Sequence, residues 1–195
     1  MIIQPDKPVI LASLSPRRRE LLQKLGLKFS VLPPHIDETR KKGEGIQTYV
    51  RRLAREKGEI VARQRPDAIV ISADTIVVYR KQILGKPLDS QEANRMLKLL
   101  SGKEHAVITA YSVQCRDLSL VLLEQEWTRV RFRKLCEEEI KAYIDTGSPL
   151  DKAGAYGIQD MTANFVRRID GCFYNVTGFP LPAFAEKWNT LFHSI

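Results

Sequence analysis

Three consecutive arginines, Arg17–Arg19, stand where a cation costs free energy unless an anion lies nearby. They follow Ser15 and Pro16, residues typical of the start of a helix. The N-terminal end of a helix carries partial positive charge and free backbone N–H groups, so each cation there costs about 0.3–1 kcal/mol unless an anion offsets it. The sequence therefore predicts an anion-binding helix end. The alternative is a solvated basic patch, which suits Arg19 best.

Lys57 is a second charge in an unfavourable position, because it falls on the apolar face of a predicted helix. That face is formed by Ile46, Tyr49, Val50, Leu53, Ala54, Ile60 and Val61. An unpaired ammonium group is costly to bury, whereas a lysine near the surface can extend its charged end into water. Lys57 is therefore expected either to reach solvent or to pair with an anion.

Carboxylates form the third group. Asp74 follows residues 68–73, a continuous apolar run typical of a central strand, and we expect it to end that strand at a cleft. Asp37 and Glu38 follow two prolines and supply a candidate second carboxylate for a divalent cation. Lys86, a cation in a Leu-Gly-Lys-Pro segment, is by itself only a weak indication of a functional site. For all of these residues the alternative is an ordinary role in a turn or loop.

Cations at a helix end, a cation on an apolar face and carboxylates at a strand end together indicate a site for a metal ion and a polyphosphate. Phosphoryl chemistry needs cations that hold charged oxygens, a metal that neutralises developing charge and a base that orients water. The sequence contains neither a Walker A loop nor a G-x-G-x-x-G segment. The familiar nucleotide-binding fingerprints therefore do not apply to this chain.

The elements expected to position these residues alternate along the chain. Strands are predicted at residues 9–12, 29–32, 68–73 with an extension through 76–79, 106–115 and 120–132. Helices are predicted at residues 16–25, 46–63, 89–100 and 137–145 and from residue 182 onward. Residues 165–169 and 173–176 are predicted to form a hairpin around Asp170-Gly171. Interleaved strands and helices favour the α/β class with a mixed sheet.

Composition narrows the class of protein further. The chain has 195 residues, 44% of them hydrophobic and 28% charged, as is typical of a globular protein. It contains no apolar run of the roughly 18 residues that a membrane helix needs and no N-terminal signal pattern. We therefore expect a cytoplasmic protein without a membrane partner.

The net charge is +8, and residues 1–65 account for it with 15 Lys and Arg against 7 Asp and Glu. Such a region suits nucleic acid, an anionic membrane or a nucleoside triphosphate.

The cysteines and histidines have no spacing that indicates chemistry. Cys115, Cys136 and Cys172 are far apart and odd in number, so we expect three buried or half-buried thiols. Neither a disulfide framework nor a zinc site is predicted. Three further residues are expected to be structural: His35, His105 and His193.

Six motifs together resemble the Maf family of nucleoside triphosphate pyrophosphatases, also called the septum-formation protein family. They are Leu11-Ala12-Ser13-Leu14-Ser15-Pro16-Arg17-Arg18, Asp37-Glu38, Leu53-Ala54-Arg55-Glu56-Lys57, Ala73-Asp74-Thr75, Gly85-Lys86-Pro87-Leu88 and Leu150-Asp151-Lys152-Ala153-Gly154-Ala155-Tyr156-Gly157-Ile158-Gln159. The resemblance covers about Val9 to Pro182. Six motifs in the family's order are far more specific than any one of them.

The resemblance implies an enzyme that hydrolyses a nucleoside triphosphate between its α and β phosphates, with a divalent cation, Mg²⁺ or Mn²⁺. It implies a nucleotide house-cleaning role in the cytoplasm and a homodimer. It also implies one domain over residues 1–195, with a twisted mixed sheet flanked by helices and two lobes around a central cleft, as in Maf and ITPase-like proteins. Each candidate inherits a role: Asp74 activates water and shares a metal with Glu38, while Ser13, Arg18, Lys57 and Lys86 hold phosphates.

The motifs also resemble one branch of the family. The branch similar to dTTP/UTP pyrophosphatases carries Arg, Thr and Gln at the positions of Arg17, Thr75 and Gln159, whereas the branch acting on 7-methyl-GTP usually has Trp and Gln at the first two. A guanidinium and an amide can pair with the edge of uracil or thymine. Two departures from the family pattern are Leu14, where a small residue is common, and Asp160, where Gly is usual. The second could alter the loop that presents Gln159.

Two alternatives remain at the level of sequence. The same chemistry could act on 7-methyl-GTP or other nucleotides, including modified pyrimidine triphosphates. Alternatively, the chain could be a basic nucleic-acid-binding or cell-division regulator without catalysis. Aromatic residues make up 8% of the chain and do not interleave with the basic residues of 1–65, as stacking platforms would. A nucleoside triphosphate is therefore the expected partner, and a nucleic acid is not.

Overall fold

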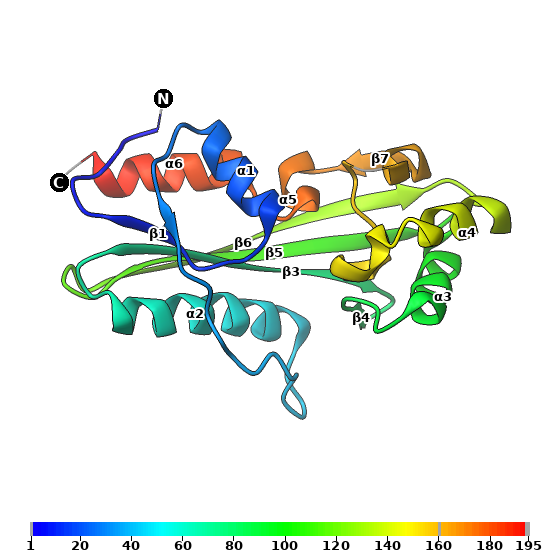
Figure 1. Cartoon of the computed structure of the whole chain (residues 1–195), viewed down its shortest axis with the longest axis horizontal. Helices are drawn as coiled ribbons and strands as arrows, with labels where there is room; N and C mark the ends of the chain where they lie inside the picture. The colour runs from blue at the N-terminus through cyan, green and yellow to red at the C-terminus, as the bar shows by residue number, and fades with distance from the viewer. Residues whose placement is uncertain (1, 160, 194–195) are drawn as a thin grey trace. The chain divides into compact units, whose positions relative to one another are not determined.

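A computed structural model describes residues 2–159 and 161–193 and has the predicted α/β class. The described residues form one seven-stranded sheet in the order β2-β1-β3-β5-β6-β7, with β4 paired to β3 (Figure 1). The strands are β1 (Val9–Leu11), β2 (Ser30–Val31), β3 (Ile69–Tyr79), β4 (Gln82–Leu84), β5 (Glu104–Cys115), β6 (Leu120–Phe132) and β7 (Val166–Asp170). The helices are α1 (Pro16–Lys24), α2 (Ile46–Gln64), α3 (Ser90–Leu100), α4 (Glu137–Asp145), α5 (Phe173–Thr177) and α6 (Leu181–Phe192). Both parallel and antiparallel pairs occur, so the predicted mixed sheet is confirmed.

The chain divides into two compact units, in keeping with the two lobes that the resemblance implies. Unit 1 comprises Met1–Asp74, Thr109–Glu126 and Gly178–Ile195. Unit 2 comprises Thr75–Ile108 and Trp127–Thr177. Strands β3, β5 and β6 contribute residues to both units. The central cleft stays a prediction.

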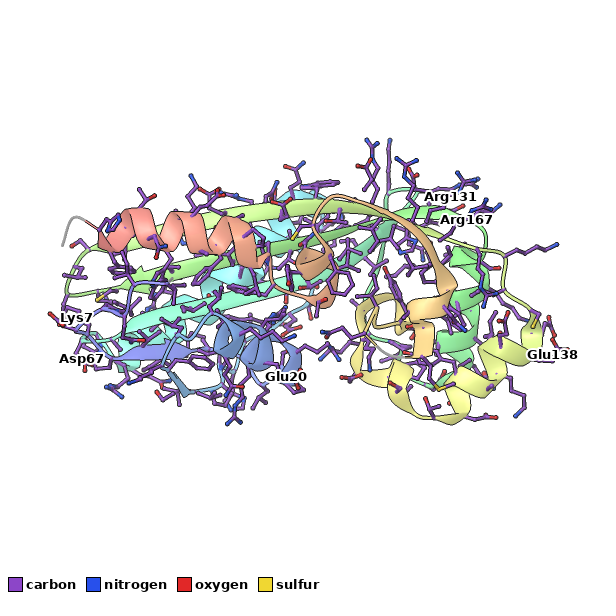
Figure 2. The ribbon with its side chains drawn as sticks, turned by 90° about the horizontal axis from the view of Figure 1, so that it is seen from above. Lys7, Glu20, Asp67, Arg131, Glu138 and Arg167 are labelled. Carbon is purple, nitrogen blue, oxygen red and sulfur yellow. The ribbon has the colours of Figure 1, made fainter. Side chains whose placement is uncertain are left out.

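Unit 1 places helices on both faces of its strands, with α1 and α6 on one face and α2 on the other (Figure 1). The alternation of β1 side chains explains this arrangement. Val9 and Leu11 join the apolar cluster of α1 and α6, whereas Ile10 joins that of α2. β1 pairs in parallel with β2 and β3, and Lys7 Nζ lies 3.5 Å from the carbonyl of Asp67 where β1 and β3 begin (Figure 2).

Unit 2 is built on the second half of β3 and on a separate apolar core. Leu97 of α3, Tyr143 of α4 and Phe132 of β6 are buried in that core. β3 and β4 form a tight hairpin through Arg80 and Lys81, both at positive φ, as a two-residue hairpin turn requires. Short 3₁₀ helices at Ser148–Asp151, Ala153–Ala155 and Met161–Phe165 follow α4. Arg131 and Arg167 lie on the exposed side of β6 and β7 (Figure 2).

Three sequence predictions were wrong. Residues 173–176 do not form a hairpin strand, because β7 pairs with β6 and Phe173–Thr177 is helix α5. The polar side chain of Asn175 drives this, since it is fully buried and donates to the Val107 carbonyl and to Thr128. Asp74 does not end a strand but lies inside β3, which continues without interruption to Tyr79. Cys136 is exposed rather than buried, because it precedes α4 as its N-cap.

Two expectations about side chains hold. All three cysteines are free, as predicted. His105 is buried and its Nε2 lies 2.7 Å from the Tyr156 hydroxyl, which fits a structural role. Among the described helices, none is long and apolar enough to cross a membrane.

Candidate active site

The site is organised by close packing of α2 on the sheet of unit 1. Gly58 makes this possible, since a Cβ there would lie 2.6 Å from both Ser72 Oγ and Gln114 Nε2. Ser72 donates to the Ala54 carbonyl at 2.6 Å, and Gln114 donates to the Arg55 carbonyl at 2.9 Å. Both bonds tie the middle of α2 to β3 and β5. The side chain of the preceding residue, Lys57, is thereby placed against β3.

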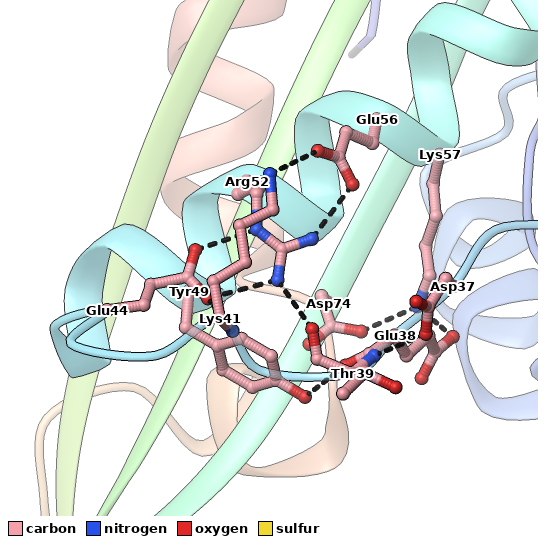
Figure 3. Close-up of polar contacts among 10 residues, drawn as sticks. All are labelled: Asp37, Glu38, Thr39, Lys41, Glu44, Tyr49, Arg52, Glu56, Lys57 and Asp74. Carbon is pink, nitrogen blue, oxygen red and sulfur yellow. Dashed lines mark hydrogen bonds and ion pairs between the residues drawn. The ribbon is translucent and has the colours of Figure 1, made fainter.

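Lys57 joins the two carboxylates that the sequence singled out (Figure 3). Its Nζ lies 2.6 Å from Asp74 Oδ1 and 2.7 Å from Glu38 Oε1. Lys57 and Asp74 are buried, with side chains 11% exposed, whereas the Glu38 side chain is 58% exposed on the loop before α2. Of the two alternatives for Lys57, pairing with an anion is therefore confirmed.

Asp74 has the electrostatic character of a proton acceptor. Burial raises its pKa above the ordinary value, and the charges of Lys57 and Arg18 oppose that shift. A poorly solvated carboxylate gains from accepting a proton, because the neutral form is the one that burial favours. The same burial lowers the pKa of the Arg18 guanidinium, a shift that the charge of Asp74 opposes.

The start of α1 forms the second part of the site. Ser15 caps the helix by accepting from the backbone N–H of Arg18 at 3.4 Å. The Arg18 side chain turns back, so that Nη1 donates to Ser13 Oγ at 3.4 Å and Nε donates to the Gly178 carbonyl at 3.0 Å. Arg17 is half-buried and Arg19 is exposed, in keeping with the solvated role expected of Arg19. Ser13 and Arg18 are therefore brought together as the motif implies.

Three candidate residues belong to unit 2. Thr75 follows Asp74 directly in β3 and is half-buried. Lys86 and Gln159 are exposed, and their segments meet because the Gly154 N–H donates to the Gly85 carbonyl at 2.9 Å. Within residues 2–159 and 161–193, neither side chain bonds another candidate residue. Asp160, the departure noted in the sequence, lies outside the described residues.

Gly154 is required at its position for two reasons. Its φ is +68°, and a Cβ there would lie 2.9 Å from Val77 Cγ2. Ala155 follows at φ +63°, which is uncommon for a residue with a side chain. This strained turn fixes the path of the 150–159 motif beside the Lys86 segment.

The carboxylate pair suits a divalent cation. Glu38 and Asp74 both approach one nitrogen within 2.7 Å, so their oxygens converge on a single point that holds a cationic group. Mg²⁺ binds through one or two carboxylates, several waters and substrate phosphates, so two protein ligands suffice. Across residues 2–159 and 161–193, no group of three or more His, Cys, Asp or Glu side chains is arranged to hold a metal. The donor set therefore fits Mg²⁺ or Mn²⁺ shared with a phosphate ligand, and it does not fit a closed protein cage.

Sequence reasoning missed the residues that hold the Glu38 loop. Arg52 bonds Glu44, Glu56 and the Thr39 carbonyl, and the hydroxyl of Tyr49 donates to the Glu38 carbonyl. The spacing of Arg52 and Glu56 on one helix face was the only local signal, and it indicates no more than a surface ion pair. The excess of charge in residues 1–65 did not reveal which cations are buried.

Comparison with known proteins assigns the family. The model of the Maf-like protein family matches residues 8–191, and the chain belongs to this family. A protein of Desulfotalea psychrophila named dTTP/UTP pyrophosphatase is 46% identical over 190 residues, which cover 97% of this chain and 96% of that protein. Proteins with the same name in Syntrophomonas wolfei and Aquifex aeolicus are 48% and 46% identical to this chain. The two alignments cover 88% and 89% of this chain and 90% of each relative. Among solved structures, that of the Staphylococcus aureus Ham1 protein aligns over 65% of this chain and 72% of that one, with 13% identity and a TM-score of 0.40.

Proposed function

We propose that this protein is a nucleoside triphosphate pyrophosphatase that hydrolyses dTTP and UTP to the monophosphate and pyrophosphate. The observation that carries the proposal is the buried Asp74 held with Glu38 by a single ammonium group, that of Lys57. The shared name of relatives 46–48% identical over most of the chain supports the choice of pyrimidine substrates. A nucleotide house-cleaning role in the cytoplasm goes with this activity.

In the proposed reaction, Asp74 accepts the proton of the attacking water. The water oxygen forms a bond to phosphorus, and the P–O bond of the α–β bridge breaks, so that pyrophosphate leaves with the bridging oxygen. Burial, which raises the pKa of Asp74, favours the proton transfer to its carboxylate. Hydrolysis in water needs no further reactant.

The cations of the site hold the substrate. Lys57 has a buried ammonium that bonds only carboxylates among the described contacts, so a triphosphate oxygen offers it an equivalent anionic partner. Arg18 presents a planar guanidinium beside Ser13, a geometry suited to a phosphate. Lys86 is proposed as a further phosphate ligand on the strength of its motif. These charges fix the polyphosphate and neutralise its negative charge.

A divalent cation, Mg²⁺ or Mn²⁺, belongs to the proposed site. Asp74 and Glu38 would hold it, and it would supply charge neutralisation at the phosphate oxygens and a lower pKa for bound water. The protein residues retain their own tasks, since Asp74 receives the proton and Lys57 binds phosphate.

Base recognition is assigned to Arg17, Thr75 and Gln159, whose side chains can pair with the polar edge of uracil or thymine. We further propose that the two compact units act as one domain, because a single family model extends over both. A homodimer is proposed from the family resemblance.

The decisive assay is pyrophosphate release from dTTP, UTP, CTP, GTP and 7-methyl-GTP, with Mg²⁺ or Mn²⁺ and with a chelator. Metal-dependent release that favours dTTP and UTP is expected. Release from 7-methyl-GTP alone would keep the reaction and refute the substrate assignment. The absence of release from every nucleotide, together with salt-dependent binding of DNA or RNA, would refute the enzymatic proposal.

A further inference from the structure

The loop that carries Glu38 lacks regular structure and contributes no residue to the apolar clusters of unit 1. Residues 33–45 contain no helix or strand, and Asp37, Glu38 and Thr39 are all exposed. An open pocket of about 630 Å³ is lined by residues of this loop and of α2. Its walls include His35 and Ile36 of the loop and Ile60 of α2. Packing within the apolar clusters therefore does not fix the position of Glu38.

Polar bonds from α2 hold this loop instead (Figure 3). The Tyr49 hydroxyl donates to the Glu38 carbonyl at 2.9 Å, and Arg52 Nη2 donates to the Thr39 carbonyl at 3.1 Å. The Arg52 guanidinium lies over the Tyr49 ring at 5.6 Å from its centre. Two successive carbonyls, of Glu38 and of the residue after it, are thus bonded to one pair of side chains.

Glu44 holds Arg52 in this position. Arg52 Nε lies 2.7 Å from Glu44 Oε1 and Nη2 lies 3.0 Å from Oε2, so the pair is bidentate. The side chains are 13% and 5% exposed, which removes most of the competition from water. Glu44 Oε2 also accepts from the Lys41 N–H at 3.1 Å, and the bonds from Arg52 lower the pKa of Glu44 to about 2. The pair therefore stays charged and bonded throughout the neutral range.

We propose that Arg52 and Glu44 form a clamp that positions the Glu38 carboxylate beside Asp74 for the divalent cation. Arg52 is a positioning residue, because it bonds the loop backbone and two carboxylates that lie outside the cation site. The inference rests on the proposed function, since that function gives Glu38 its role as a ligand. Residues around a metal that orient its ligands typically contribute 10–100-fold to affinity.

The test is a double-mutant cycle on Mn²⁺ binding, measured by electron paramagnetic resonance with the full chain. Arg52→Gln is expected to weaken binding about tenfold in the wild type and to have no effect in a Glu38→Gln background. Arg52→Lys keeps the positive charge but cannot form the bidentate contact of the guanidinium. It is expected to bind Mn²⁺ more tightly than Arg52→Gln but less tightly than the wild type. Arg63→Gln is the matched control, because Arg63 lies on the same helix and pairs with Glu59.

An equal loss of Mn²⁺ affinity with and without Glu38 would overturn the proposal, because Arg52 would then act by another route. Hydrogen exchange of the loop amides supplies a readout that does not depend on metal. Arg52→Gln is expected to speed exchange over residues 38–44 about tenfold and to leave β1 unchanged, whereas unchanged exchange in the loop would also overturn the clamp. If the wild type bound no Mn²⁺ but the loop loosened as expected, the proposed metal site would fail and the clamp would survive.

Discussion

Replacement of Lys57 by methionine isolates the electrostatic core of the site. Methionine keeps most of the apolar volume of the lysine stem, so the variant removes the ammonium with little change in packing. Although Lys57 lies on the apolar face of α2, an apolar residue there is expected to be unfavourable, because Lys57 pairs with the buried Asp74 at 2.6 Å.

The expected cost follows from what the substitution leaves behind. Removing one partner of a buried ion pair leaves an uncompensated charge and typically costs about 3–5 kcal/mol. The Glu38 contact adds little, because that side chain is 58% exposed. For a protein of this size the loss corresponds to roughly 6–20 °C in Tm. Asp74→Asn removes the carboxylate that Lys57→Met leaves buried without its partner. The double variant Lys57→Met/Asp74→Asn is therefore expected to recover most of the stability.

The pH dependence gives a second signature. Burial raises the pKa of Asp74 in the folded protein above its pKa in the unfolded chain. Ionisation of Asp74 therefore lowers the free energy of unfolding as the pH rises from the unfolded-state pKa through the folded-state pKa. Without Lys57 the folded pKa rises further, and the penalty extends to higher pH. The variant is therefore expected to match the wild type below about pH 4 and to lose stability progressively toward pH 8.

Urea unfolding followed by circular dichroism, at pH 4 and at pH 8, measures both effects. The reasoning would be refuted if Lys57→Met were as stable as the wild type at pH 8. It would also be refuted if Asp74→Asn failed to rescue the variant, since the loss would then come from packing rather than from the stranded carboxylate.

Further predictions concern specificity, packing and acid stability. Arg17→Ala is expected to change the ratio of kcat/KM for dTTP to that for CTP more than it changes total hydrolysis, and an unchanged ratio would exclude Arg17 from base recognition. Gly58→Ala is expected to cost about 1–3 kcal/mol in urea unfolding, because its Cβ would lie 2.6 Å from Ser72 and Gln114. Burial lowers the pKa of His105 to about 3, so the unfolded chain binds the extra proton between about pH 6.5 and 3 and stability falls on acidification, by up to about 1.4 kcal/mol per pH unit. His105→Gln is expected to remove that component of the pH profile, and an identical profile would show that His105 does not produce it.

Local sequence signals were sufficient to predict helices whose capping residues or apolar periodicity lie within the helix itself. The Ser15-Pro16 start of α1 and the apolar face of α2 lie where they were predicted. The anomalous position of Lys57 was also an accurate guide, because burial of an ammonium demands a partner and the structure supplies Asp74. An unfavourable charge can thus be recognised from sequence before its partner is known.

The failures came from contacts that no local sequence pattern describes. Helix α5 depends on Asn175, whose partners Val107 and Thr128 are 68 and 47 residues away. The clamp between Arg52 and Glu44 depends on the path of an irregular loop, which no periodicity describes. Residue spacing cannot identify such contacts, since the fold alone determines them.

The most direct test of the account is the identity of the products of dTTP turnover by the wild type and by Asp74→Asn, followed by ³¹P NMR with Mg²⁺ present. The wild type is expected to yield dTMP and pyrophosphate, and Asp74→Asn to turn over about 100-fold more slowly or less while remaining folded. Asp117→Asn serves as the matched control, because Asp117 is an exposed carboxylate that pairs with Lys7. Formation of dTDP and phosphate by the wild type, or near wild-type turnover by Asp74→Asn, would contradict the account.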